Sequence, residues 1–149
     1  MAVVESVCIV AAEDDDGHAS LIERNLRRAG LSNDLVRLRD GQEAIDYFIG
    51  PRADAHAGAC VLLLDIKMPR VDGVEVLRQL RQDPRTVALP IIMLTTTDDP
   101  REIERCYDLG CNVYVTKPVE YEPFVEAIRR LGLFLQVIKV PNNNKPAGQ

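Results

Sequence analysis

The sequence lacks a long apolar run, an excess of positive charge and any cysteine pair in Cys-x-x-Cys spacing. A membrane-spanning helix needs about 18 or more consecutive apolar residues, so we predict no membrane partner. The 18 Lys and Arg against 23 Asp and Glu give a net charge of -5, which disfavours nucleic acid as a partner. The cysteine spacings also disfavour a zinc site or a disulfide framework.

The first ten residues have no basic segment ahead of an apolar run and no small-residue cleavage pattern, so they do not resemble an export signal. We therefore expect a cytoplasmic protein whose cysteines remain reduced thiols. The cysteines are Cys8, Cys60, Cys106 and Cys111.

What the sequence does contain is a regular alternation of apolar runs and helix-period stretches. Its 149 residues, 46% hydrophobic and 28% charged, suit one globular domain. Alternation of this kind is typical of parallel strands joined by crossover helices. It predicts an α/β fold, a doubly wound five-stranded parallel sheet with helices on both faces.

Strands are predicted over residues 3–12, 33–38, 61–64, 90–94 and 113–116. Helices are predicted to include residues 19–29, 44–48, 74–80, 99–110 and 124–131. Asp99, Pro100 and Glu102 form a typical helix start, and Gly110 a typical stop.

Charged and hydroxyl side chains follow the predicted strands where each strand ends. Glu13 and Asp14 end the first strand, Asp65 the third, Thr95 the fourth and Lys117 the fifth. In an open parallel sheet these carboxyl ends meet at the edge where ligands bind. Close carboxylates repel one another unless a cation lies between them, so the cluster predicts a site for Mg²⁺.

A carboxylate beside Mg²⁺ can act as a nucleophile toward phosphorus and form an aspartyl phosphate. Lys117 would then neutralise the transferred group, and the Thr95 hydroxyl could move onto one of its oxygens. Each residue taken alone also fits a plainer role, as a turn acid, a helix cap or a surface lysine. Their shared edge is what favours a site.

The same residues lie in motifs that resemble the two-component response regulator receiver domain. The motifs are the acids Glu13 and Asp14, Leu-Leu-Leu-Asp-Ile-Lys-Met-Pro-Arg-Val-Asp-Gly from Leu62, Met-Leu-Thr-Thr from Met93, and Tyr-Val-Thr-Lys-Pro from Tyr114. Their order and spacing are highly specific and cover roughly residues 5 to 131. The resemblance implies a flavodoxin-like sheet with strand order 2-1-3-4-5.

The resemblance also implies a role for each site residue. Asp65 is matched to the phosphoacceptor, Thr95 to the switch hydroxyl, Tyr114 to the aromatic switch and Lys117 to the phosphate-binding lysine. The implied ligands of Mg²⁺ are Glu13, Asp14, Asp65 and the backbone carbonyl of Lys67.

Four features add detail to this resemblance. Glu13 replaces the aspartate of many relatives by a longer side chain. Lys67 and Thr97 lie where side chains in this family tune dephosphorylation, so they leave the phosphate's lifetime open. The bond from Lys117 to Pro118 is typically cis in such proteins, which makes it a candidate for that geometry.

We divide the chain into a receiver domain, residues 1–131, and a carboxyl-terminal arm with a disordered tail, residues 132–149. The arm is too short for an effector domain, which predicts a stand-alone receiver. The implied partners are a sensor histidine kinase, similar to the phytochrome type, and a downstream protein or histidine phosphotransferase. The arm is rich in apolar residues, which predicts a homodimer formed through it and the last helix, or an arm folded back on its own domain.

Competing functions fit the sequence less well. A Mg²⁺-dependent phosphatase with an aspartyl nucleophile usually carries a second carboxylate two residues later, where this chain has Lys67. A flavin or nucleotide binder would need a phosphate loop after the first strand. A degenerate receiver acting only as a scaffold is disfavoured because every site position is filled. We therefore expect a phosphoacceptor and not a turnover enzyme.

Overall fold

The computed structural model describes residues 7–53, 58–138 and 140, in which strands and helices alternate along the chain. The strands are β1 (Cys8–Ala12), β2 (Leu35–Leu38), β3 (Cys60–Leu64), β4 (Ile91–Thr95) and β5 (Val113–Thr116). The helices are α1 (Asp16–Arg28), α2 (Gly41–Ile49), α3 (Gly73–Gln82), α4 (Pro100–Leu109) and α5 (Tyr121–Leu135). Every predicted strand and helix is present.

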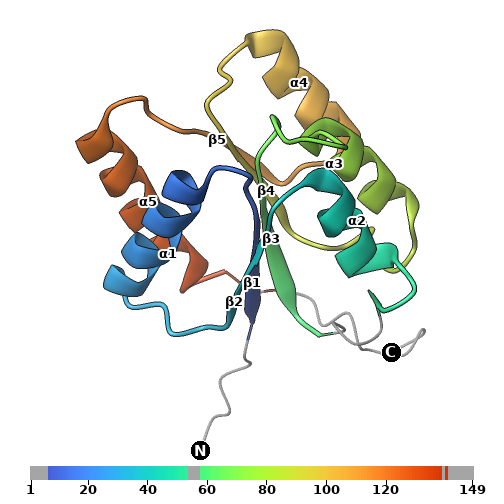
Figure 1. Ribbon diagram of the computed structural model, residues 1–149, viewed down its shortest axis with the longest axis horizontal. Coiled ribbons are helices and arrows are strands. Elements are labelled where there is room, and N and C mark those ends of the chain that lie inside the picture. Colours follow the sequence, from blue (N-terminus) through green and yellow to red (C-terminus); the bar gives the residue numbers. More distant parts are fainter. Residues whose placement is uncertain (1–6, 54–57, 139, 141–149) are drawn as a thin grey trace, which may run out of the picture.

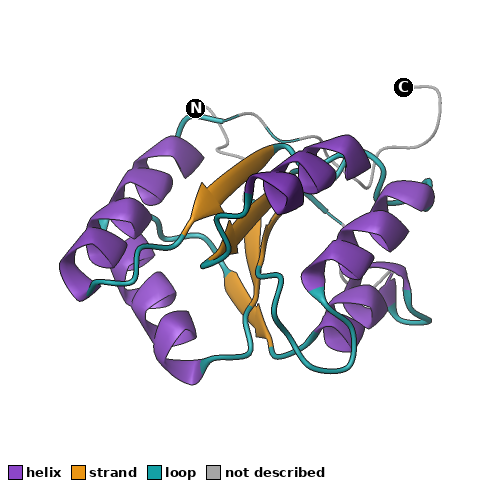
Figure 2. Ribbon diagram, turned by 90° about the horizontal axis from the view of Figure 1, so that it is seen from above, coloured by secondary structure: helices purple, strands orange, loops and turns teal. Residues whose placement is uncertain are grey.

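The strands form one parallel sheet in the order β2-β1-β3-β4-β5, which confirms the predicted fold. Helices α1 and α5 cover one face of the sheet, and α2, α3 and α4 cover the other (Figure 1). Figure 2 shows the sheet between these two helical layers. The carboxyl ends of the strands lie at the top of the molecule as drawn in Figure 1.

Alternate residues of each central strand enter opposite hydrophobic clusters, because side chains alternate across a strand. In β3, Leu62 and Leu64 face the layer of α2, α3 and α4. Val61 and Leu63 face α1 and α5. This two-sided burial explains why the strand is an unbroken apolar run in the sequence.

The first four helices each begin at an aspartate whose side chain accepts a hydrogen bond from the backbone of the first turn. These caps are Asp15, Asp40, Asp72 and Asp99. Helix α5 begins at Glu120 without a side-chain cap. Helix α4 ends as predicted at Gly110, whose φ of 109° is left-handed.

Strand boundaries differ from the prediction by a few residues. β2 begins at Leu35 and not at residue 33, and the Asn33 side chain bonds the Val7 carbonyl instead. β4 begins one residue later than predicted, because Pro90 has no N–H to donate. Residues 3–6 of the predicted first strand lie outside the described residues.

The arm that was expected after residue 131 begins inside a helix, because α5 continues to Leu135. Leu135, Ile138 and Val140 pack against the cluster beneath α1 and α5. Leu133, Phe134 and Val137 are instead 46%, 44% and 72% exposed. The predicted tail, residues 141–149, lies outside the described residues. None of the described helices combines the length and the apolar character that crossing a membrane requires.

Candidate functional site

The carboxyl ends of four strands bring the predicted site residues to one edge of the sheet. Glu13 follows β1, Asp65 follows β3, Thr95 is the last residue of β4, and Lys117 follows β5. Glu13, Asp65, Thr95 and Lys117 are all buried, although each carries a polar or charged group. A buried polar cluster at this edge is typical of a ligand site.

Lys117 lies at the centre of the cluster. Its Nζ donates hydrogen bonds to Glu13 Oε1 and, over 3.1 Å, to Asp65 Oδ2. The side chains of Lys117, Glu13 and Asp65 are 1%, 3% and 10% exposed. Water therefore screens this charge group weakly, and its members interact more strongly than surface ions do.

The Glu13 carboxyl shows how unfavourable this burial is. Burial raises the pKa of Glu13 from 4.5 to about 7, although the Lys117 ammonium acts in the opposite direction. The nearby charge of Asp65 raises it further. One ammonium thus does not fully compensate the two buried carboxylates, and an additional cation would favour their ionised forms.

Asp14 completes an acidic group at the mouth of the site. Glu13, Asp14 and Asp65 each place a carboxylate oxygen within 4.8 Å of the others. Asp14 is exposed, whereas the other two are buried. Hard carboxylate oxygens at this spacing fit Mg²⁺. Lys67, whose backbone carbonyl we predicted as a further ligand, lies in the exposed loop two residues after Asp65.

Two contacts fix the Asp65 carboxylate and its loop. Its Oδ1 accepts a hydrogen bond of 2.7 Å from the Ile66 backbone N–H, which leaves Oδ2 to Lys117. Gly73, at the start of α3, approaches so closely that a Cβ there would overlap the Asp65 carbonyl oxygen. The motif therefore needs glycine at this position to hold the loop against the helix.

The Thr95 hydroxyl is buried without a partner. Thr95 is fully buried, and its Oγ1 has no hydrogen-bond partner within the described part of the chain. Its carbonyl accepts a 2.7 Å bond from the Lys117 backbone N–H, so the two residues are directly linked. An unpaired buried hydroxyl costs about 1–3 kcal/mol, which a ligand oxygen within reach would recover.

Tyr114 is held at both ends. Its hydroxyl donates a 2.6 Å hydrogen bond to the Thr97 carbonyl, in the loop between β4 and α4. Its backbone N–H donates a 3.0 Å bond to the hydroxyl of Tyr107 on α4. Burial raises the pKa of Tyr114 to about 12, so the phenol stays protonated as a donor.

The run of four acids after β1 divides into two functions. Glu13 and Asp14 belong to the acidic group of the site. Asp15 caps α1 by accepting a 2.9 Å bond from the His18 backbone N–H. Asp16 forms ion pairs with Arg37 and Arg39. Of the second pair of acids, Asp15 therefore caps the helix, whereas Asp16 forms ion pairs at the helix start.

The expectation of a cis bond between Lys117 and Pro118 is wrong, because the described residues contain no cis peptide bond. For a bond preceding proline the trans form is favoured by about 0.5–1 kcal/mol. The trans form here still brings the Lys117 side chain to Asp65.

Sequence reasoning missed His18. Its Nδ1 lies 3.2 Å from Lys117 Nζ and 3.9 Å from Glu13 Oε1. The signal was available, since His18 falls in the first turn of the helix that follows the acidic pair. First-turn side chains at this edge of a doubly wound sheet lie beside the strand ends.

Comparisons with known proteins agree with this geometry. Residues 9–129 match the sequence profile of the response regulator receiver domain. The probable methanogenesis regulatory protein FilR2 of Methanothrix harundinacea is 33% identical over 123 residues, which are 83% of this chain and 79% of FilR2. The chain spans about half the length, 48 to 50%, of several other curated relatives, and its match with the response regulator Rcp1 of Synechocystis covers 92% of that protein.

The comparison with solved structures finds chains that match over nearly their whole length. A response regulator receiver domain from Rhodospirillum rubrum is 50% identical, with a TM-score of 0.86 and coverage of 91% of this chain and 97% of that one. The phosphorylated cyanobacterial phytochrome response regulator RcpA is 29% identical, with a TM-score of 0.81 and coverage of 91% and 98%.

Proposed function

This chain belongs to the response regulator receiver family, and on that premise we propose that Asp65 accepts a phosphoryl group from a sensor histidine kinase. The observation that carries the proposal is the buried Lys117 ammonium, which contacts Asp65 beside two further carboxylates. A buried lysine in this position neutralises charge where a phosphoryl group would bind. The chain then signals through protein contacts or passes the group to a histidine phosphotransferase.

The transfer is a substitution at phosphorus. A carboxylate oxygen of Asp65 attacks the phosphorus of the kinase phosphohistidine, so that a P–O bond forms while the P–N bond breaks and its electrons return to the imidazole. Lys117 donates hydrogen bonds to the transferred oxygens. Glu13, Asp14, Asp65 and the Lys67 carbonyl would hold Mg²⁺. The chemistry that a bound Mg²⁺ supplies is neutralisation of charge on the phosphoryl oxygens.

Thr95 and Tyr114 would couple phosphorylation of Asp65 to a conformational change at the protein surface. Phosphorylation adds negative charge and several acceptor oxygens, which the unpaired Thr95 hydroxyl can bond. Movement of Thr95 opens space toward which Tyr114 can rotate, releasing the Thr97 carbonyl that it now bonds. Lys67 is exposed and Thr97 is half-buried, and we expect these two side chains to influence the lifetime of the phosphate.

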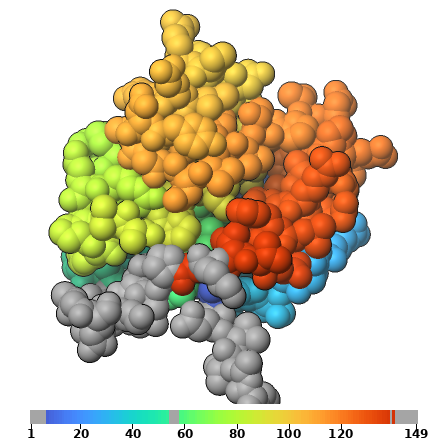
Figure 3. Space-filling view, turned by 180° about the vertical axis from the view of Figure 1, so that it is seen from behind, coloured from blue at the N-terminus to red at the C-terminus, as the bar shows by residue number. Residues whose placement is uncertain are grey.

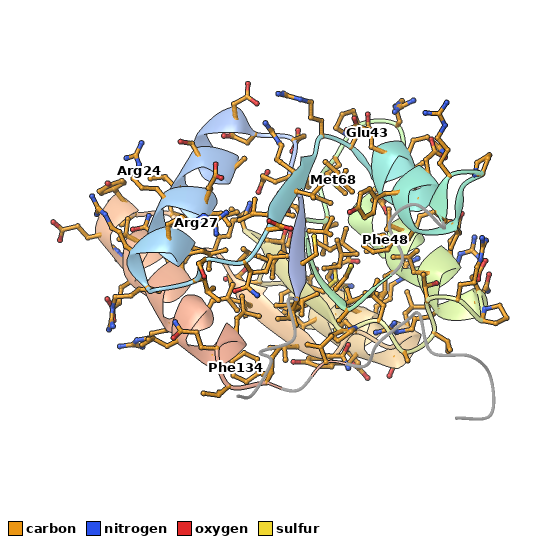
Figure 4. All side chains as sticks on the ribbon, turned by 90° about the horizontal axis from the view of Figure 1, so that it is seen from below. Arg24, Arg27, Glu43, Phe48, Met68 and Phe134 are labelled. Carbon is orange, nitrogen blue, oxygen red and sulfur yellow. The ribbon has the colours of Figure 1, made fainter. Side chains whose placement is uncertain are left out.

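The partners follow from the same premise. A phytochrome-type histidine kinase in the cytoplasm is the proposed donor, supported by the similarity to RcpA. The exposed side chains of Leu133, Phe134 and Val137 support a homodimer through the end of α5. Figure 4 shows Phe134 at the periphery of the molecule. In Figure 3, seen from behind, this end of α5 is the red region at the surface.

The test of phosphoryl transfer is direct. The protein, with Mg²⁺ and acetyl phosphate, should gain one phosphoryl group by intact mass spectrometry, and Asp65→Asn should gain none. Asp108→Asn, which removes an exposed acid of α4, is the matched control and should behave as wild type. An unmodified wild type, or a phosphorylated Asp65→Asn protein, would overturn the proposal. Steady turnover of phosphomonoesters would instead identify a phosphatase.

The dimer is tested by solution mass. Phe134→Asp combined with Val137→Asp should convert a dimer to a monomer, because both side chains are exposed and apolar. Val119→Asp, at an exposed apolar residue between β5 and α5, is the control and should leave the mass unchanged. A monomeric wild type would end the dimer proposal and leave the arm folded on its own domain.

A further inference from the structure

The Lys117 ammonium has three protons and three acceptors. Two acceptors are the carboxylates of Glu13 and Asp65, and the third is Nδ1 of His18 at 3.2 Å. An ammonium group can only donate, so Nδ1 must accept and the ring proton must lie on Nε2. His18 thereby satisfies the last hydrogen-bond donor of a fully buried charge.

The position of the His18 ring is fixed from two sides. Its backbone N–H is bound by the Asp15 side chain, which anchors the first turn of α1. Its ring packs on Phe124 of α5, with ring centroids 5.3 Å apart and an angle of 31° between the planes. Phe124 is itself buried in the core. The acceptor atom is therefore held by two helices, α1 and α5.

We propose that His18 is a positioning residue that aims the Lys117 ammonium at the phosphoryl site. This inference rests on the proposed function. When Asp65 is phosphorylated, Lys117 must donate to new phosphoryl oxygens, and its bond to His18 keeps Nζ at the site during that exchange. Without this acceptor, one N–H of the ammonium has no hydrogen-bond partner, and Nζ is held by two contacts in place of three. Its orientation toward Asp65 is then less restricted.

Two variants separate the acceptor from the ring. His18→Asn keeps an acceptor oxygen close to the position of Nδ1 but loses the ring on Phe124. His18→Phe keeps an aromatic ring there but loses the acceptor. The His18 side chain is 36% exposed, so both variants are expected to fold, which circular dichroism checks.

The first measurement is the rate of phosphoryl uptake from acetyl phosphate with Mg²⁺. Loss of one hydrogen bond to a buried charge should slow His18→Phe by about tenfold. His18→Asn should remain within about twofold of wild type, because the acceptor is restored. If His18→Phe matches wild type, or if His18→Asn is as slow as His18→Phe, the ring acts by packing and the proposal is wrong.

The second measurement needs no phosphorylation. In ¹⁵N NMR spectra of lysine side chains, the Lys117 ammonium protons should exchange slowly with water in wild type and His18→Asn, and faster in His18→Phe. Equal exchange in the three proteins would overturn the positioning role. If wild type took up no phosphoryl group, the proposed function would fail, while this measurement would still decide whether His18 holds Lys117.

Discussion

The middle of each central strand and its carboxyl end are both buried, but burial acts on them in opposite directions. Leu62 and Leu64 of β3 are fully buried, and the next residue, Asp65, is only 8% exposed. Removing an apolar side chain from water is favourable by about 25 cal/mol per Å². Removing a charge from water is unfavourable unless it is paired. The apolar body of the sheet thus stabilises the fold, whereas its carboxyl edge opposes it.

This difference indicates what the edge is for. Glu13 illustrates the penalty, since burial raises its pKa to about 7 despite the adjacent Lys117. Thr95 adds a buried hydroxyl without a partner. Each of these unfavourable features is relieved by an added cation or by an added oxygen acceptor. Proteins tend to break packing rules at functional sites, and the apolar body supplies the stability that permits it.

The largest expected effect on stability lies in the hydrophobic cluster that Leu62 and Leu64 of β3 share with helices α2, α3 and α4. Leu80→Ala removes a fully buried side chain of α3 and should lower the free energy of unfolding by about 2–5 kcal/mol. Urea denaturation measures it, with Val87→Ala as the exposed control. Phosphoryl uptake per folded molecule should not change. A change in uptake would show that the apolar core and the carboxyl edge of the sheet do not act independently.

The next effect concerns the edge and pH. A folded-state pKa of Glu13 raised from 4.5 to about 7 means that the folded protein binds an extra proton between these values. Stability from this group is present below pH 4.5 and is lost as the pH rises through about 7. In EDTA, raising the pH from about 5 to about 7.5 should therefore lower the free energy of unfolding by about 1–3 kcal/mol.

Glu13→Gln is the matched variant for this pH effect, because it cannot titrate. Its stability should lack the fall that Glu13 causes over the same range, in which Glu75 and Glu126 stay ionised. Cys8, whose pKa is lowered to about 7 by its hydrogen bond with Cys60, titrates in both proteins alike. Urea denaturation at several pH values compares the two proteins, and an identical pH dependence would show that the edge carries no burial penalty at Glu13.

A smaller effect of pH is expected on the affinity for Mg²⁺. Mg²⁺ binds the ionised carboxylate, so its affinity should fall as the pH drops below the Glu13 pKa of about 7. At pH near 6 the affinity should be roughly tenfold weaker than at pH near 7.5, which is about 1.4 kcal/mol. Isothermal titration calorimetry measures it. An affinity independent of pH would mean that Glu13 is not a ligand.

Prediction from sequence succeeded where the signal is local. The unbroken apolar run before Asp65 identified β3, because a strand buried on both faces has no alternation. The cap at Asp99 and the stop at Gly110 gave the ends of α4. Parallel topology then brought the strand ends together without any knowledge of side-chain contacts.

Contacts between distant residues were not predictable in this way. The approach of His18 to Lys117 depends on the packing of α1 against α5, including the ring contact with Phe124. The bond from the Tyr114 backbone to the Tyr107 hydroxyl depends on how α4 lies over β5. The Lys117 to Pro118 bond has too small an intrinsic preference for its isomer to follow from sequence.

The smallest expected effect is that of replacing Asp99, an acid that caps a helix, in contrast to Asp65, an acid of the site. Asp99 caps α4, and its Oδ1 accepts a 2.9 Å bond from the Arg101 N–H. Asp99→Ala should lower the free energy of unfolding by about 1 kcal/mol, whereas Asp99→Asn should have almost no effect, since asparagine caps as well. Urea denaturation measures both. Phosphoryl uptake should be normal in each variant. Capping requires only a hydrogen-bond acceptor at residue 99, whereas phosphoryl transfer requires the ionised, nucleophilic carboxylate of Asp65. Reduced uptake in Asp99→Asn would mean that the cap also contributes its charge to the site.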